Sequence, residues 1–278
     1  MFPYLGGKAN HAQWISPYIP QCSTYCEVFG GAMWLYWQSD KTPVSTNVYN
    51  DLNRHLVNVF ACASKDRKHY QEVLSTYVYD LGSEEMFNEY RNEVFEIYNN
   101  NFIIPDYPLA AKYMVLQLQT FAGNTGLQPT SKIYRSPDKK HKFNIYTEKL
   151  NQPKYVKKLS KLTTENLDCF DFIQKYDTAD TFLYIDPPYK NHEKYYTQND
   201  FDKPNQLLEL LKKTKNAKWA LSYYEFDDLK DLLPPDEYVW HKQKTHSMNS
   251  TNRGERTELL VMNYNNHSLE SLFEADEH

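Results

Sequence analysis

The sequence has few features that would direct the protein to a membrane or out of the cell. The chain begins with Met1, which leads directly into Phe2-Pro3-Tyr4 without the apolar run of a secretory signal. No stretch approaches the roughly 20 apolar residues that cross a membrane. These absences predict a soluble protein that works in the cytoplasm.

Cysteine is rare, and neither cysteine nor histidine occurs in a metal-binding pattern. The nine histidines show no paired ligand spacing, and no Cys-x-x-Cys pair is formed by the four cysteines, Cys22, Cys26, Cys62 and Cys169. The sequence therefore predicts buried free thiols and no metal site.

The chain also lacks the overall basic charge that often accompanies nucleic-acid binding, because its net charge is −5. The distribution of this charge is uneven. Residues 131–162 carry ten basic and two acidic side chains, a net charge of +8, which leaves −13 on the rest of the chain. A basic segment on an acidic body can attract phosphates locally, although a solvated charged surface would give the same composition.

The N-terminal part of the chain has the pattern of a nucleotide-binding α/β sheet. Residues 24–29 form a short apolar run that ends at Gly30-Gly31, and an apolar stretch with helical spacing follows at 32–36. A second run at 44–49 ends at Asn50-Asp51. Strand, glycine turn, helix and a strand with a terminal acid about 20 residues on make one half of such a sheet.

The rest of the chain divides into a helical insertion and a second α/β part. Residues 54–63 and 66–122 are mainly helical in pattern, and a polar stretch at 123–138 precedes the basic segment. The α/β pattern resumes at about 163, with strands expected at 182–185, 217–222, 238–242 and 258–264 and helices at 204–214 and 225–233. We predict a catalytic domain formed by 1–65 and 163–270, an inserted target-recognition lobe at 66–162, and a polar tail at 271–278.

The most informative motif is Asp186-Pro187-Pro188-Tyr189, which directly follows the apolar strand at 182–185. Ligands of open parallel sheets bind beyond the carboxyl ends of the strands. A carboxylate and the carbonyl of Pro187, whose direction the fixed proline φ helps to set, can accept both N–H groups of an exocyclic amine. Tyr189 offers a flat face for stacking an extruded base. A strand that simply ends in a proline turn is the structural alternative.

At this point the sequence resembles the Dam-like family of adenine-N6-specific DNA methyltransferases of bacteria and phages. The resemblance covers most of the chain, in order, through the segments 4–8, 27–31, 49–53, 171–172, 186–189, 221–224 and 260–264. It implies a class I S-adenosylmethionine-dependent fold: a seven-stranded, mostly parallel sheet with helices on both faces and an inserted DNA-recognition lobe. The activity it implies is methyl transfer from S-adenosylmethionine to N6 of an adenine flipped out of double-stranded DNA.

The resemblance also assigns roles to residues. Asp186, Pro187, Pro188 and Tyr189 match its catalytic motif without substitution. The cofactor-binding residues that it implies are Tyr4, Lys8, Glu27, Phe29, Gly30, Gly31, Asp51, Asp171 and Phe172, with Asp51 on the ribose hydroxyls. Met33 departs from the pattern, because the family commonly has a glycine or small residue there. A bulky side chain at this position predicts a narrower methionine pocket.

The DNA-contacting residues are less clearly marked. Well-known members place an arginine after a Gly-Leu pair to read guanine, whereas here Gly126-Leu127 is followed by Gln128, which pairs better with adenine. The target sequence therefore does not carry over. Lysines are expected to contact phosphates mainly. The predicted DNA-binding residues are Asn124, Gln128, Arg135, Lys139, Lys140, Lys142, Asn144, Lys154, Lys157, Lys158 and Lys161, the last four sharing a helix face.

Other functions remain open at this level. Cytosine-N4 methyltransferases use the same geometry but more often have serine in place of Asp186, and protein-glutamine methyltransferases typically have asparagine there. An RNA substrate would be flipped at lower cost. A catalytically silent DNA-binding or anti-restriction module is a further alternative, against which the intact Asp186 and Tyr189 argue. The protein is expected to be a monomer or a weak dimer.

Overall fold

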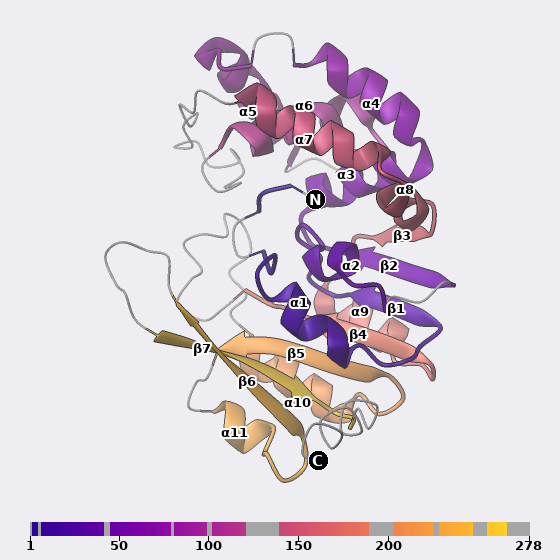
Figure 1. Ribbon diagram of the computed structural model, residues 1–278, viewed down its shortest axis with the longest axis vertical. Helices are drawn as coiled ribbons and strands as arrows, with labels where there is room; N and C mark the ends of the chain where they lie inside the picture. The colour runs from indigo at the N-terminus through magenta and orange to yellow at the C-terminus, as the bar shows by residue number, and fades with distance from the viewer. Residues whose placement is uncertain are drawn as a thin grey trace, which may run out of the picture.

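The computed structural model describes residues 2–4, 7–41, 45–78, 81–98, 102–120, 139–188, 203–224, 228–246 and 255–265. In these residues a twisted sheet of seven strands is covered by helices on both faces (Figure 1). The strands, in spatial order, are β3 (Leu162–Glu165), β2 (Thr46–Asn50), β1 (Thr24–Glu27), β4 (Thr181–Ile185), β5 (Lys218–Tyr224), β7 (Glu255–Met262) and β6 (Val239–His246).

The strand directions confirm the predicted fold class. Adjacent strands are parallel from β3 through β2, β1 and β4 to β5. The strand β7, which lies between β5 and β6, is antiparallel to both. A mostly parallel sheet with one reversed strand next to the edge is the class I methyltransferase arrangement. Because β1 pairs with both β2 and β4, their carboxyl ends lie at one edge of the sheet.

Side chains of the central strands alternate between two buried layers, as the period of two in a strand requires. On one face lie Tyr25, Tyr49 and Phe182, and on the other lie Cys26 and Leu183, with all five side chains at 0% exposure. Strands buried on both faces are typical of parallel sheets, which explains their nearly continuous apolar runs.

The first face is covered by helices from both sides of the insertion. They are α1 (Ala12–Ile15), a 3-10 turn (Ser16–Tyr18), α2 (Trp34–Gln38), α3 (Arg54–Lys65) and α8 (Pro153–Leu159). The other helices of the insertion, α4 (Arg67–Thr76), α5 (Glu84–Tyr98), α6 (Tyr107–Gln119) and α7 (Lys139–Asn151), stack beyond α3, where α6 packs against α3 (Figure 1). Four helices of the chain's first 120 residues begin at side-chain caps, because Asn53, Asp66, Ser83 and Asp106 accept hydrogen bonds from the first backbone N–H groups of α3, α4, α5 and α6.

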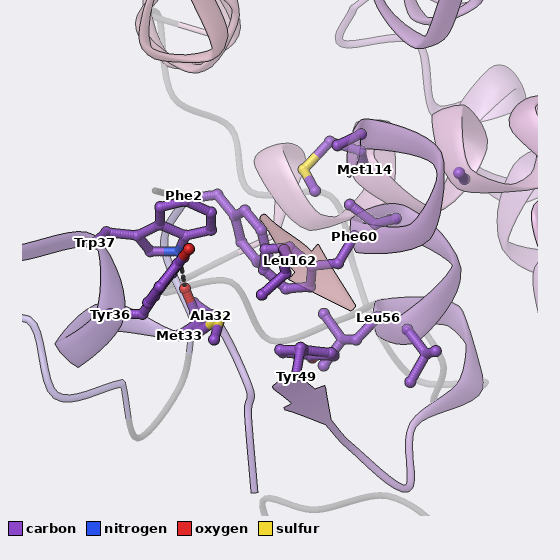
Figure 2. Packing of buried hydrophobic residues seen from close by; sticks show 14 of the residues in the cluster. Phe2, Ala32, Met33, Tyr36, Trp37, Tyr49, Leu56, Phe60, Met114 and Leu162 are labelled. Carbon is purple, nitrogen blue, oxygen red and sulfur yellow. Dashed lines mark hydrogen bonds between the residues drawn. The ribbon is translucent and has the colours of Figure 1, made fainter. Parts of the chain in front are cut away.

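The helical insertion shares its core with the sheet. Phe2, Trp37 and Tyr49 pack in the same buried cluster as Phe60 of α3 and Met114 of α6 (Figure 2). Burying an aliphatic or aromatic side chain of this size contributes about 1.5–3 kcal/mol. The described part of the predicted lobe therefore continues the core of the catalytic domain.

The opposite face is covered by α9 (Cys169–Tyr176), α10 (Pro204–Lys213) and α11 (Leu229–Leu232). In α10 the buried side chains Leu207, Leu208 and Leu211 lie on one stripe, at the i, i+1 and i+4 spacing of an amphipathic helix. The side chain of Asp168 caps α9 through the N–H of Phe170.

Several element boundaries differ from the sequence-based expectation. The strand β3 was not among the expected strands, because only Leu162 of its four residues is buried. The expected helix at 66–122 is divided into α4, α5 and α6, with Gly82 at φ 111° in the first break. The last strand begins at Glu255 and ends at Met262, rather than spanning 258–264.

Candidate active site at the carboxyl edge of the sheet

Asp186 is the first residue after β4, so its position is set by the central strand of the sheet. Its side chain is 16% exposed, between the fully buried strand and the surface. Pro187 is buried and Pro188 is partly exposed. Tyr189 lies outside the described residues. The carboxylate thus stands at the edge where ligands of such sheets bind.

Lys8 lies against this carboxylate. Its Nζ is 3.4 Å from Asp186 Oδ1 and 2.6 Å from Oε1 of Glu258, a residue of β7. Burial by itself lowers the pKa of Lys8, but the charges of Asp186 and Glu258 more than offset this effect and raise the pKa above 10.5. A residue expected at the cofactor therefore carries a positive charge beside the catalytic motif.

Glu258 was not among the predicted site residues, although it is fully buried. Its Oε1 accepts a 2.7 Å hydrogen bond from Ser222 Oγ on β5 as well as the bond from Lys8. The sequence does contain a signal. Leu260 and Met262 pack on the first face of the sheet, and a period of two places Glu258 on the same buried face.

The glycine turn after β1 is closely packed. A Cβ on Gly30 would lie 2.2 Å from Tyr49 Cε2, so only glycine fits between β1 and β2. Gly31 has φ +47°, and a Cβ there would approach the ring of Tyr4 to 3.0 Å. The ring of Tyr4 therefore lies against the turn, whereas Phe29, just before it, is partly exposed.

Asp51 joins this turn to the end of β2. Its Oδ2 accepts from the N–H of Gly31 at 2.8 Å, and its Oδ1 accepts from the N–H of Asn53 at 2.7 Å. Burial raises the pKa of Asp51 to about 6 despite these bonds. A carboxylate has about four lone-pair sites, so the two bonds leave capacity for a pair of hydroxyl donors. The remaining acceptor sites of Asp51 fit the two hydroxyl groups of a ribose.

Glu27 faces the protein interior rather than the edge. Its Oε1 accepts hydrogen bonds from the Tyr25 hydroxyl at 2.8 Å and from the backbone N–H of Tyr36 at 2.9 Å. Burial raises the pKa of Glu27 to about 8. The side chain therefore links β1 to α2. Because both bonds use Oε1, the predicted contact with the cofactor would have to use the other carboxylate oxygen, Oε2.

Met33 occupies a left-handed backbone conformation, with φ 55° and ψ 43°. This conformation costs a non-glycine residue about 1–2 kcal/mol, which gives a physical reason for the small residue expected here. The side chain is 1% exposed and packs in the cluster of Figure 2. Its bulk thus fills the core, and the predicted effect on cofactor affinity stays a prediction.

The two expected adenine-binding residues on α9 have different environments. Asp171 is exposed in the first turn of the helix. Phe172 has no exposed surface, and its ring packs 4.5 Å from that of Tyr176. The ring of Phe172 thus packs in the core on the inner side of α9, and its expected contact with the cofactor's adenine stays a prediction.

The predicted DNA-binding residues fall into three groups. Asn124, Gln128 and Arg135 lie outside the described residues. Lys139 begins α7, where Lys140 and Asn144 are exposed and Lys142 is half-buried. The remaining lysines, Lys154, Lys157, Lys158 and Lys161, belong to α8 and the turn after it.

The α8 group does not form one uniform lysine face. Lys158 is half-buried and donates to the carbonyl oxygens of Tyr36 and Ser39, the latter at 2.7 Å. Burial lowers its pKa to about 8. Lys161 lies beyond the end of the helix at Leu159. The expectation of four equivalent phosphate contacts is therefore wrong for Lys158, because its ammonium caps the carboxyl end of α2.

This group also lies at the opposite edge of the sheet from Asp186. The helix α8 leads into the first residue of β3, and Lys154 pairs with Asp40, which precedes β2, at 3.0 Å. Parallel strands begin at one edge and end at the other. Lys154 therefore lies near the edge at which β2 begins, whereas Asp186 lies at the edge at which β4 ends.

Within the described ranges, no cluster of three or more potential metal ligands is present. The four cysteines are free. None of the helices that the structure describes is both long and apolar enough to span a bilayer.

Comparison with known proteins shows the family of this chain. Residues 4–249 match the family of D12 class N6 adenine-specific DNA methyltransferases. A type II methyltransferase of Methanocaldococcus jannaschii, M.MjaIII, is 26% identical over 94% of this chain and 97% of its own.

Similar solved structures include two proteins described as methyltransferases. The yhhF protein of Escherichia coli aligns with a TM-score of 0.38 and 8% identity over 93% of this chain and 85% of its own. HI0767 of Haemophilus influenzae aligns with a TM-score of 0.37 and 11% identity over 95% and 92%. The fold assignment rests on the strand order. Because the family match covers residues 4–249, the chain belongs to the D12 class of N6 adenine-specific DNA methyltransferases.

Proposed function

We propose that the carboxyl edge of the sheet binds S-adenosylmethionine and an adenine flipped out of duplex DNA, with Asp186 gripping the amino group. Methyltransferases of this kind use S-adenosylmethionine in general, which supplies the electrophilic methyl group. The observation that carries the proposal is Asp186 at the tip of β4, held beside Lys8 between the strands β1 and β5.

The cofactor assignment is supported by the glycine turn and by Asp51. The hydrogen bond from Gly31 to Asp51 holds a carboxylate next to a turn that a larger residue could not form. We propose that Asp51 accepts from the ribose hydroxyls and that Tyr4, Gly30 and Gly31 line the methionine side. Asp171 at the start of α9 remains the proposed contact for the cofactor's adenine.

The chemical role of the catalytic motif follows from the weak nucleophilicity of an adenine amine. Its lone pair is delocalised into the ring, and two acceptors on its N–H groups draw the nitrogen toward a tetrahedral geometry. We propose that these are the Asp186 carboxylate and the Pro187 carbonyl. Methyl transfer to this nitrogen leaves a proton to be lost, and Asp186 is the base proposed to take it. Correct alignment alone can lower such a barrier by several kcal/mol.

We propose that phosphates are contacted first by the exposed part of α7, with Lys140, Lys142 and Asn144. Sequence reading is assigned to Asn124 and Gln128, and further phosphate contacts to Arg135 and Lys139. Lys154, Lys157 and Lys161 would meet DNA only if the duplex extends to the opposite edge of the sheet. A monomer or weak dimer acting in the cytoplasm is the proposed working form.

The substrate class can be tested with purified protein. Unmethylated genomic DNA, the same DNA after heat denaturation, and total RNA are incubated with S-adenosylmethionine and digested to nucleosides for mass spectrometry. We expect N6-methyladenine in duplex DNA at a level at least about 10-fold above denatured DNA or RNA. The reason is that basic side chains can contact the closely spaced phosphates of both strands, which strengthens binding to the duplex. Preference for RNA, or methylation of cytosine N4, would contradict the proposal.

A further inference from the structure

Glu258 is a charged residue in a place where charge is rarely found. It lies within β7, directly before the apolar run Leu259–Met262, and has 0% exposure. Glutamate is almost never fully buried unless it is paired. Here the pairing is to Lys8, 250 residues away in the chain, and to Ser222 of the adjacent strand β5. A long-range buried ion pair next to a catalytic motif invites a functional explanation.

The two carboxylates around Lys8 are not equivalent. The Lys8 ammonium is 2.6 Å from Glu258 Oε1 but 3.4 Å from Asp186 Oδ1. Charge-assisted N–H···O bonds are typically about 2.7–2.9 Å long. Lys8 therefore makes a short hydrogen bond to Glu258, whereas it acts on Asp186 through its charge at a longer distance.

This asymmetry matters for an acceptor that must grip an amine. A nearby ammonium favours the ionised form of Asp186. If the same ammonium formed a short hydrogen bond to Asp186, it would compete with the substrate amine for that carboxylate. The Ser222 hydroxyl, 2.7 Å from the same Oε1 atom, fixes the position of Glu258 and hence the place to which Lys8 is drawn.

We propose that Glu258 is a positioning residue for methyl transfer. By taking the short hydrogen bond of Lys8, it holds the ammonium where it supports the charge of Asp186 without occupying the oxygen that receives the substrate amine. The inference rests on the proposed role of Asp186 as the acceptor of the adenine amine. Glu258 acts through Lys8 and touches no reacting atom.

The test replaces Glu258 by glutamine, which keeps the volume and an acceptor for Ser222 but removes the charge. Lys8 should then move to Asp186, the remaining carboxylate. We expect the single-turnover rate of methyl transfer to duplex DNA to fall about 10- to 100-fold, the size of effect that misplacing a catalytic group produces. The dissociation constant for DNA should stay within about threefold of wild type, because Glu258 is fully buried.

Two variants separate positioning from folding. Glu258→Asp restores the charge and should recover most of the lost rate. Glu93→Gln removes a more exposed Lys–Glu pair, with Lys112, in the helical lobe and should leave the rate unchanged. Thermal unfolding is followed for each protein. If Glu258→Gln does not fold, Ser222→Ala removes one hydrogen bond to the same oxygen and should slow the transfer by a smaller factor at unchanged DNA affinity.

Each result decides the inference. A folded Glu258→Gln protein that transfers methyl within threefold of the wild-type rate overturns it, as does a loss that Glu258→Asp fails to reduce or an unchanged rate in Ser222→Ala. Failure of the proposed function is distinguishable, because then Asp186→Asn would itself keep the wild-type rate. An inactive Asp186→Asn with a fully active Glu258→Gln would reject only the role of Glu258.

Discussion

Asp51 accepts a 2.8 Å hydrogen bond from the backbone N–H of Gly31, the residue 20 positions earlier in the chain. The bond joins the turn after β1 to the end of β2, which are neighbouring parallel strands. Two motifs that are separate in the sequence thus form one unit at the carboxyl edge. A substitution of either residue should therefore change the binding of the same ligand.

Replacing Asp51 by alanine should weaken cofactor binding. The change removes the proposed acceptor for the ribose hydroxyls and releases the Gly31 N–H. Hydrogen bonds to a charged group are worth about 1.5–3 kcal/mol, so the dissociation constant for S-adenosylmethionine should rise at least about 10-fold in calorimetry. As a control, Asp66→Ala removes a carboxylate that caps α4 far from the turn and should leave this constant unchanged. Equal affinities in all three proteins would refute the cofactor site.

Gly30→Ala should destabilise the fold itself. The added Cβ would meet the Tyr49 ring at 2.2 Å and the backbone oxygen of Asn50 at 2.8 Å. Overpacking of this kind costs typically about 1–3 kcal/mol, and a backbone atom yields little. Denaturant unfolding should show the loss. Gly7→Ala should cost less, because its Cβ would meet the Trp34 side chain at 2.9 Å and the backbone oxygen of Tyr4 at 3.0 Å, which are both longer contacts than the 2.2 Å at Gly30. The packing argument is wrong if the two variants are ranked in the reverse order.

The pKa of Glu27 predicts a pH dependence of stability. Since burial raises this pKa from 4.5 to about 8, the folded protein binds more protons than the unfolded chain between these values. The free energy of unfolding therefore falls as pH rises through this window, by up to about 1.4 kcal/mol per pH unit from this group. Glu27→Gln lacks the contribution. Its stability relative to wild type should increase between pH 5 and pH 8, and a constant difference would show that Glu27 is not neutral in the fold.

The lysines of α8 should separate into a structural and a surface type. Lys158→Ala removes the donor to Tyr36 and Ser39 and should lower the free energy of unfolding by about 1–3 kcal/mol. Lys157 is exposed, and Lys157→Ala should change stability by less than about 0.5 kcal/mol. Chemical denaturation of both variants gives the comparison, and equal stabilities would restore the view that the two side chains are equivalent.

The fold was predictable where local signals agreed with burial. The apolar runs of β1, β2 and β4 are continuous because these strands are covered on both faces, and their pattern is visible without a structure. The strand β3 was not predictable in this way. Its residues Thr163, Thr164 and Glu165 are not buried, since it lies at the edge of the sheet.

The site was only partly predictable. The position of Asp186 and Asp51 at the carboxyl edge was predictable because each directly follows a strand. Glu258 was missed because its partner Lys8 is 250 residues away, so the pair exists only in the folded chain. The interior contacts of Lys158 were missed for a related reason. Residue type suggests what a side chain can do, but packing against α2 decides where the side chain of Lys158 points.

The central claim is that the Asp186 carboxylate grips the amino group of adenine. The most direct measurement expresses the wild-type chain and its Asp186→Asn variant in a host that lacks adenine methylation, with nucleoside mass spectrometry of the genomic DNA. We predict N6-methyladenine with the wild-type chain and none with the variant at equal protein levels. Undiminished methylation by Asp186→Asn, or unmethylated DNA with the wild-type chain, would contradict the account.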